Sequence, residues 1–349
     1  MAEIKLRNMQ IQNFKGFKDF KIEFGEHTTI KGANGTGKSS VLDAWMWLVA
    51  GTDSLGRTKF NYRPIDVPTE DIEVMAEVEV DGENHILKKV QTTDGNGKNT
   101  NRFMVDEWDY KEKDYKAEVE KLMGCRLDLF KALSSPTGFT ALHWTAQRAL
   151  IMPMAKAVKD TDIADSDLLK LLKEHDIEDI VKKYDKDAKA LKKKLMEIPI
   201  RIDENERMKP EHMDLRISTL KDEQKAIAQQ IANAERILFL CEEYRKAKCQ
   251  AVQDSINEKF PSFIKFELFD SLGKENCEVT NNGVRFSTLS TGQRIKVGAH
   301  IIQALQKFYG VQLPVWYDNF EAISGEFTVI VPQEIKMIVA DYGLEVDRE

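Results

Sequence analysis

The start of the chain alternates apolar and polar positions in short runs, the pattern of half-buried β-strands. Apolar side chains recur in this way over residues 4–11 and 20–24, and residues 28–30 form a third short run that leads directly into Gly32. Three strands are therefore expected before residue 32.

A second alternating region follows at residues 72–80 and 84–92, where apolar and charged side chains take turns. Asp81 and Gly82 lie between the two runs and suit a tight turn, so the region predicts a β-hairpin. The polar stretch 94–101 predicts a loop, and residues 112–157 predict mostly helix.

The middle of the chain has a different, narrower apolar stripe. Mostly apolar residues step by four and three positions over 177–198 and again over 213–241, with Lys, Asp, Glu and Gln between them. This heptad spacing is typical of coiled coils, and Pro199 and Pro210 should bracket a break between the helices. An antiparallel coiled-coil hairpin is expected. The alternative, two amphipathic helices packed on a globular core, would usually show a broader apolar stripe.

The remaining segments complete an α/β pattern. After the hairpin the sequence predicts a strand at 279–286, a helix at 293–308 and strands at 313–317 and 335–346. The expected domain segments are an N-terminal lobe at 1–176, the hairpin at 177–250 and a C-terminal lobe at 251–349.

Composition limits the partners and the compartment. The chain has 51 basic and 58 acidic residues and a net charge of −7, so a DNA partner must meet a local basic groove. The four cysteines form no CxxC pair, and the N-terminus has no apolar leader. No window reaches the roughly 18 apolar residues of a membrane span. A soluble, cytoplasmic protein without a membrane partner is expected.

The strongest chemical signal is a phosphate-binding loop of the form GxxxxGK[ST]. A short strand precedes it and an apolar helix follows, so backbone N–H groups and a helix N-terminus would face an anion. Lys38 would reach the β and γ phosphates, and the Ser39 hydroxyl would bind Mg²⁺. The residues expected to bind the nucleotide here are Gly32, Asn34, Gly35, Thr36, Gly37, Lys38, Ser39 and Ser40.

A second anion site is indicated by the segment Leu-Ser-Thr-Gly-Gln-Arg at 289–294. Ser290 offers a hydroxyl, Gly292 offers an unshielded backbone N–H, Gln293 follows, and a helix begins behind them. The alternative is that Ser290 only caps that helix.

A carboxylate ends the apolar strand at 313–317. Asp318 stands where an aspartate that binds Mg²⁺ would be expected, although a turn residue at a strand end has the same pattern.

These motifs, together with Asn-Phe-Lys-Gly-Phe at 13–17, occur in the order seen in the RecF, RecN and SMC group of ATP-binding-cassette (ABC) proteins. The chain most resembles SbcC and its phage-encoded relatives. This resemblance implies one ATPase head built from both lobes, with the coiled coil projecting from it. It also implies ATP and Mg²⁺ as ligands and a homodimer in which two heads enclose two ATP molecules. Each ATP would lie between one phosphate loop and the partner's Ser290 and Gly292. Double-stranded DNA and a nuclease subunit are the further partners that it implies.

The resemblance also implies a role for Lys15, and the chain departs from the family pattern in three places. Lys15 would contact phosphate or adenine, with a solvated lysine as the alternative. Asn319 stands where the family has a catalytic glutamate, so Glu321 becomes the candidate base; otherwise turnover is slow and the protein is a nucleotide-gated DNA clamp or tether. No histidine follows His300 to sense the γ-phosphate, and the apex of the coil has no CxxC for a zinc hook.

For Gln147 and for the lysines of the first heptad helix, a structural explanation stands beside the functional one. Gln147 is either a metal or water contact or a polar residue on an amphipathic helix. The lysines of the first heptad helix are either a track for duplex DNA or a solvated face. A small-molecule P-loop kinase would leave residues 289–294 and the coil unexplained.

Overall fold

The computed structural model describes the chain except residues 1, 65–69, 208–212, 271–272 and 349. The chain divides into two compact units. The first, here the sheet unit, contains Met1–Ala155, Ile256–Leu268 and Glu275–Glu349, and the second, the helical unit, contains Lys156–Ser255 and Phe269–Lys274. The two ends of the chain therefore fold together, whereas the boundaries expected at 176 and 250 stay a prediction. Within the described ranges, no helix has the length and apolar character needed to cross a membrane.

The larger sheet of the sheet unit has seven strands in the order β11-β1-β4-β5-β6-β7, with β2 also paired to β1. Its strands are β1 (Ala2–Phe14), β2 (Phe17–Glu23), β4 (Ile72–Val80), β5 (Glu83–Thr93), β6 (Asn99–Val105), β7 (Trp108–Tyr110) and β11 (Val311–Gln312). A register shift between Leu6 and Asn8 changes the phase of the apolar positions. The expected hairpin is confirmed, because β4 and β5 pair around Asp81 and Gly82, which both have positive φ.

The loop expected over 94–101 is shorter than predicted. The Asp94 carboxylate accepts hydrogen bonds from the N–H groups of Asn96 and Lys98, which closes a tight turn. Asn99 can therefore pair directly with Thr93, and residues 99–101 belong to β6.

The smaller sheet has the order β12-β13-β3-β14. Its strands are β3 (His27–Gly32), β12 (Val315–Tyr317), β13 (Glu334–Val339) and β14 (Glu345–Arg348). The single strand predicted over 335–346 is wrong: β13 pairs parallel with one edge of β3 and β14 pairs antiparallel with the other edge. The chain must leave β13 and cross the end of β3, so residues 340–344 cannot continue the strand.

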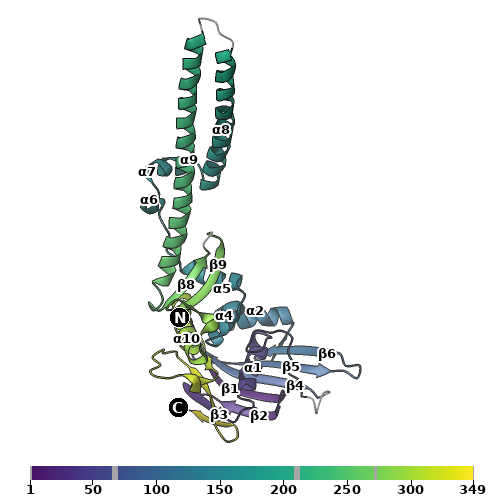
Figure 1. Cartoon of the computed structure of the whole chain (residues 1–349). Helices are drawn as coiled ribbons and strands as arrows, with labels where there is room; N and C mark the ends of the chain where they lie inside the picture. The colour runs from purple at the N-terminus through teal and green to yellow at the C-terminus, as the bar shows by residue number, and fades with distance from the viewer. Residues whose placement is uncertain (1, 65–69, 208–212, 271–272, 349) are drawn as a thin grey trace. The chain divides into compact units, whose positions relative to one another are not determined.

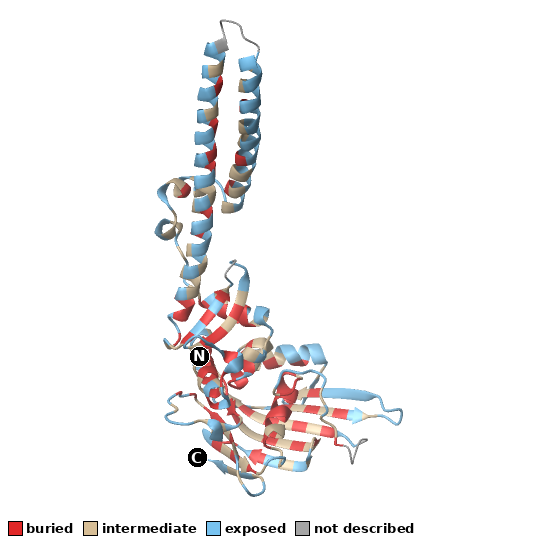
Figure 2. Cartoon of the chain, viewed as in Figure 1, coloured by how far each residue is buried: buried red, intermediate tan, exposed pale blue. Residues whose placement is uncertain are grey.

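Helix α1 (Lys38–Val49) contacts β1, β4 and β5 of the larger sheet and β3 of the smaller one. Ten of its twelve residues are buried, as expected for a helix enclosed on all sides. Figure 2 shows buried residues concentrated on α1 and on the strands beside it. This packing fixes the start of α1 relative to both sheets.

Further helices and a small sheet complete the sheet unit. The helical expectation for 112–157 is confirmed by α2 (Glu112–Leu122), α3 (Leu127–Ser134), α4 (Gly138–Ala141), α5 (Trp144–Ile151) and the short η1 (Met152–Met154). The later elements are β8 (Ile264–Phe269), β9 (Glu275–Asn281), β10 (Val284–Arg285), η2 (Phe286–Thr288), α10 (Thr291–Tyr309) and η3 (Phe320–Ala322). The strand expected over 279–286 is instead interrupted, because Asn282 and Gly283 have positive φ and turn the chain from β9 into β10.

The helical unit contains α6 (Asp160–Ile163), α7 (Ser166–Leu172), α8 (Ile177–Arg207) and all but the last two residues of α9 (Met213–Asn257). Ion pairs join Glu178 to Arg245, Lys192 to Glu235 and Arg201 to Glu223. Partners further along α8 lie earlier along α9, so the two helices run antiparallel (Figure 1). Their facing sides are the buried ones (Figure 2). One apolar cluster between them contains Ile198, Leu220, Ile227 and Ile231, and another, nearer α7, contains Leu168, Ile180, Cys241 and Tyr244.

The expectation that the first helix breaks at Pro199 is wrong. Helix α8 continues through Pro199 to Arg207, at about 1.5 Å per residue a length of about 46 Å. Ile198 is buried and Ile202 packs against the same cluster, so contacts with α9 on both sides of the proline compensate for its missing hydrogen bond. Pro210 lies outside the described residues.

Candidate functional site

The loop between β3 and α1 is the centre of the site. β3 ends at Gly32 and α1 begins at Lys38. Gly35 and Gly37 have φ values of 85° and 101°, a region that side chains disfavour, so glycine is required where the loop curls. The Thr36 hydroxyl donates to the Ala33 carbonyl at 2.9 Å, which holds the turn from within.

Lys38 is folded over this loop. Its side chain is 8% exposed, and Nζ donates to the carbonyl oxygens of Gly32 at 2.7 Å and Ala33 at 3.0 Å. A positive charge is therefore held at the loop by backbone dipoles, and an anion entering the loop would compete with those carbonyls for it.

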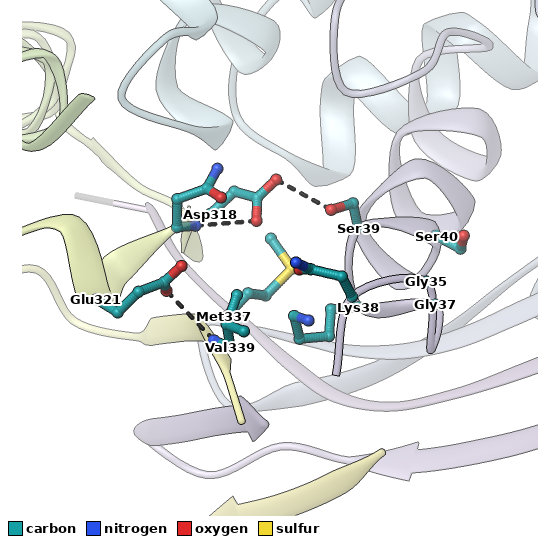
Figure 3. Close-up of a pocket in the computed structure, with 11 residues that line it drawn as sticks. Gly35, Gly37, Lys38, Ser39, Ser40, Asp318, Glu321, Met337 and Val339 are labelled. Atoms are coloured by element: carbon teal, nitrogen blue, oxygen red, sulfur yellow. Dashed lines mark hydrogen bonds between the residues drawn. The ribbon is translucent and has the colours of Figure 1, made fainter. Parts of the chain in front are cut away.

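Ser39 and Asp318 meet across the sheet. β3 and β12 both run parallel to β13, so their carboxyl ends lie at the same edge. Ser39 lies in the first turn of α1, which follows β3, and Asp318 directly follows β12. The Ser39 hydroxyl donates to Asp318 Oδ2 at 3.0 Å (Figure 3). A hydroxyl and a carboxylate are oxygen ligands of the kind that Mg²⁺ prefers, usually completed by phosphate and water.

These groups line a pocket of about 220 Å³, whose lining side chains are drawn in Figure 3. It is lined by Asn34, Gly35, Gly37, Lys38, Ser39, Ser40, Asp318, Asn319, Glu321, Met337 and Val339. Gly32 and Thr36, also expected to bind the nucleotide, do not line it: Gly32 ends β3, and the Thr36 hydroxyl bonds within the loop. Met337 and Val339 come from β13, a strand that no sequence motif had linked to the site. Among the described residues, no group of three His, Cys, Asp or Glu side chains forms a metal cluster.

The residues after Asp318 form a sharp turn. Asn319 adopts the left-handed conformation, with φ 55° and ψ 42°, and η3 follows it. Glu321 lies in η3 at the pocket, where Oε2 accepts a hydrogen bond from the Val339 N–H at 3.3 Å (Figure 3). The carboxylate of Glu321 is thus held at the pocket wall by β13.

Lys15 is paired elsewhere. Its ammonium donates to the carboxylate of Asp43 on α1 and lies 5.6 Å from the centre of the Phe60 ring. It does not line the pocket. A contact between Lys15 and a nucleotide would require this ion pair to open.

Ser290, Gly292 and Gln293 lie at the start of α10. Ser290 caps the helix, since its hydroxyl accepts from the Gln293 N–H while the Gln293 side chain accepts from the Ser290 N–H. Gly292 packs so closely on η3 that a Cβ there would lie 2.2 Å from the Ala322 carbonyl oxygen. None of the three lines the pocket, and Ser290 is exposed.

Gln147 has a structural role in the described chain. Its side-chain amide donates to the carbonyl oxygens of Leu142 at 2.7 Å and Thr140 at 3.3 Å, which satisfies the end of α4. It lines a different pocket, beside Trp144 and Arg294.

The comparisons with known proteins identify the family. The family model described as AAA domain matches residues 8–261. The chain belongs to this AAA domain family. The matched range includes the phosphate loop and both long helices of the helical unit, whereas Ser290 and Asp318 lie beyond it. No curated protein matches the chain.

Two solved structures resemble the chain loosely. The "recombination mediator protein RecF-ATP in RecFOR pathway" has 16% identity and a TM-score of 0.43, over 99% of this chain and 94% of that one. The "recombination mediator protein RecF-ATPrS in RecFOR pathway" has 14% identity and a TM-score of 0.40, over 99% and 95%. Superpositions this loose do not establish a shared fold.

Proposed function

We propose that the protein is an ATP-binding and ATP-hydrolysing ABC-type ATPase of the SbcC kind, acting in DNA repair or recombination. The observation that carries this proposal is the hydrogen bond between Ser39 and Asp318 at the pocket that the phosphate loop lines. It joins two motifs that are 279 positions apart in the sequence into one site with a hydroxyl, a carboxylate and a lysine.

ATP and Mg²⁺ fit the residues of this pocket. Lys38 would leave the carbonyls of Gly32 and Ala33 to neutralise the β and γ phosphates, and the loop N–H groups would hold the phosphate oxygens. Ser39 and Asp318 would hold Mg²⁺, which supplies positive charge where phosphate charge develops.

The nucleotide would also join two copies of the chain. Ser290 is exposed at the N-terminus of a 19-residue helix, yet it does not line the pocket of its own chain. This placement favours a homodimer in which Ser290 and Gly292 face the triphosphate of the partner. ATP would then stabilise the dimer because it contacts both chains, and hydrolysis would release it.

The helical unit supports the DNA part of the proposal. We infer that α8 and α9 form a short antiparallel coiled coil, since the positions buried on α9 step through Leu220, Ile227, Ile231, Ala234 and Cys241. The lysines of α8 are exposed and would contact duplex DNA: Lys182, Lys183, Lys186, Lys189, Lys192, Lys193 and Lys194. A nuclease subunit bound near the coil would complete the assembly.

Glu321 is the proposed base for hydrolysis, because it is the carboxylate at the pocket beyond Asp318. The second candidate function is a nucleotide-gated DNA clamp or tether with weak hydrolysis. It is favoured by Asn319, an amide that cannot accept a proton from water, and by the engagement of Glu321 with Val339.

Light scattering with and without a slowly hydrolysed ATP analogue tests the dimer. The particle mass should double with nucleotide, Lys38→Ala should abolish the change, and Lys98→Ala, which removes a lysine from an exposed turn, should leave it intact. A mass that nucleotide does not alter in the wild type would contradict the homodimer.

Phosphate release separates the two candidate functions. The ATPase should show turnover that duplex DNA stimulates and that falls at least about tenfold in Glu321→Gln, whereas the clamp should dimerise without such turnover. DNA stimulation measured over a salt series should decline steeply if lysines contact phosphates.

A further inference from the structure

Helix α8 carries two large apolar side chains that its packing against α9 does not use. Met196 is 74% exposed and Ile200 is 60% exposed. They lie four positions apart, so at about 3.6 residues per turn they are neighbours on one face. The side chains that pack towards α9, Leu195 and Ile198, belong to a different face.

The charge of α8 reverses at this apolar pair. The residues before Met196 include the row of lysines that ends at Lys194. After it, acidic residues outnumber basic ones: Glu197, Asp203, Glu204 and Glu206 against Arg201 and Arg207. Lys193 lies three positions before Met196 and Asp203 lies three positions after Ile200. The four side chains form one stripe, here the α8 stripe: Lys193, Met196, Ile200 and Asp203.

The α8 stripe is complementary to itself in one orientation. If a second copy lies antiparallel across it, Met196 faces Ile200 of the other copy, and Lys193 faces Asp203. The same register brings Lys192 near Glu204 at the edge of the contact. A parallel arrangement would instead place Lys193 against Lys193 and Asp203 against Asp203, which is repulsive.

We propose that the α8 stripe is an interface on which a second copy of this chain docks antiparallel. Duplex DNA is a poorer occupant of this stripe, because the acidic half of α8 repels phosphates and the apolar pair gains nothing from them. A docked copy would occupy Lys193 and leave the lysines nearer the start of α8, from Lys182 to Lys189, for DNA. The interface is small, since each copy contributes two apolar side chains, and contacts of this size give weak association. It becomes effective when chains are already concentrated, for example along one DNA molecule.

Sedimentation equilibrium of the Lys38→Ala protein without nucleotide, at low salt, tests the interface separately from any ATP-dependent dimer. A concentration-dependent dimer is expected. The double variant Met196→Asn with Ile200→Asn should lower the association constant at least about tenfold. Lys193→Glu or Asp203→Lys alone should each lower it by about threefold to tenfold.

The decisive variant combines Lys193→Glu with Asp203→Lys. It exchanges the charges but keeps the antiparallel pairs complementary, so association should recover to within about twofold of the parent. The matched control, Lys193→Glu with Glu206→Lys, changes the same charges outside the register and should not recover.

Three results would overturn the proposal: a monomer at every concentration, a dimer unchanged by the two asparagines, or no recovery in the exchanged pair. Circular dichroism of each variant, with unchanged helical signal, shows that α8 itself is retained. None of these results bears on the ATP-dependent homodimer, which is tested separately by whether the mass of the wild type doubles with ATP.

Discussion

A single methyl group at Gly292 should disturb the pocket through the backbone of its own chain. A Cβ at this position would lie 2.2 Å from the carbonyl oxygen of Ala322, whereas ordinary contact begins near 3.4 Å. In Gly292→Ala, α10 and η3 must therefore separate by about 1.2 Å along this line. Because η3 carries Glu321, the displacement reaches a residue that lines the pocket.

The cost follows from two opposing terms. Overpacking in a close backbone contact costs about 1–3 kcal/mol, and replacing glycine by alanine within a helix returns up to about 1 kcal/mol. A net loss of about 1–2 kcal/mol of unfolding free energy is expected. Gly298→Ala is the matched variant, because its Cβ would meet the Pro136 carbonyl oxygen at 1.9 Å, on the same helix but away from η3.

Urea unfolding and phosphate release, measured under conditions where each protein is folded, test this reasoning. Both variants should lose stability, but only Gly292→Ala should lose turnover, by about tenfold or more. It should also weaken ATP binding by the isolated monomer, which a defect confined to the dimer contact would not do. Gly95→Ala, with open space around its Cβ, should change neither property. Two results would refute the proposal that the clash at Gly292 reaches the pocket through η3. One is full stability in Gly292→Ala, and the other is an equal loss of turnover in Gly292→Ala and Gly298→Ala.

Two further predictions concern a buried lysine and the metal site. Burial lowers the pKa of Lys89 to about 7 from an ordinary value of 10.5. Between these two pH values the unfolded chain binds more protons than the folded chain, so the free energy of unfolding should rise with pH. From pH 7 to pH 9 the rise should be at most about 2 kcal/mol, because the Trp47 ring, 3.8 Å from the amine, favours the charged form. Urea melts at the two pH values should show that this rise is lost in Lys89→Met. An equal change of unfolding free energy with pH in the wild type and the variant would contradict the prediction. Asp318→Asn should leave the unfolding free energy within about 1 kcal/mol but raise the Mg²⁺ concentration needed for tight ATP binding at least about tenfold. Calorimetric titration at several Mg²⁺ concentrations measures this shift, and an unchanged requirement would remove Asp318 from the metal site.

The sequence predicted the parts of the fold that local patterns determine. Alternation identified β4 and β5, and Asp81 and Gly82 identified their turn, because both strands are buried on one face and the turn needs positive φ. In the smaller sheet it predicted β3 and β12, but it merged β13 and β14 into one strand. The position of β13 between β3 and β12 depends on its pairing with β3, which lies about 300 residues earlier in the chain, and no local pattern reports such pairing. Met337 and Val339 were therefore not anticipated at the pocket.

At Pro199, packing against α9 outweighs the local preference of proline to end a helix. Proline disfavours the interior of a helix, so a break there was the reasonable expectation. The apolar positions on both sides of it, Ile198 and Ile202, nevertheless keep the heptad spacing and pack with Leu220 and Ile227. The lost hydrogen bond costs less than the contacts that an early end of α8 would remove.

At Asn319, unlike at Pro199, the local backbone conformation explains which residue is present. Its φ of 55° lies in the left-handed region, which asparagine tolerates better than other residues except glycine. A glutamate at this position would be strained, whereas the turn places Glu321 at the pocket. We therefore expect Asn319→Glu to lose about 1 kcal/mol of stability without raising turnover, and Asn319→Gly to keep both. Phosphate release and urea melts of the two variants measure this. A large gain of turnover in Asn319→Glu would show instead that position 319 is the natural place of the base, and that Glu321 is not.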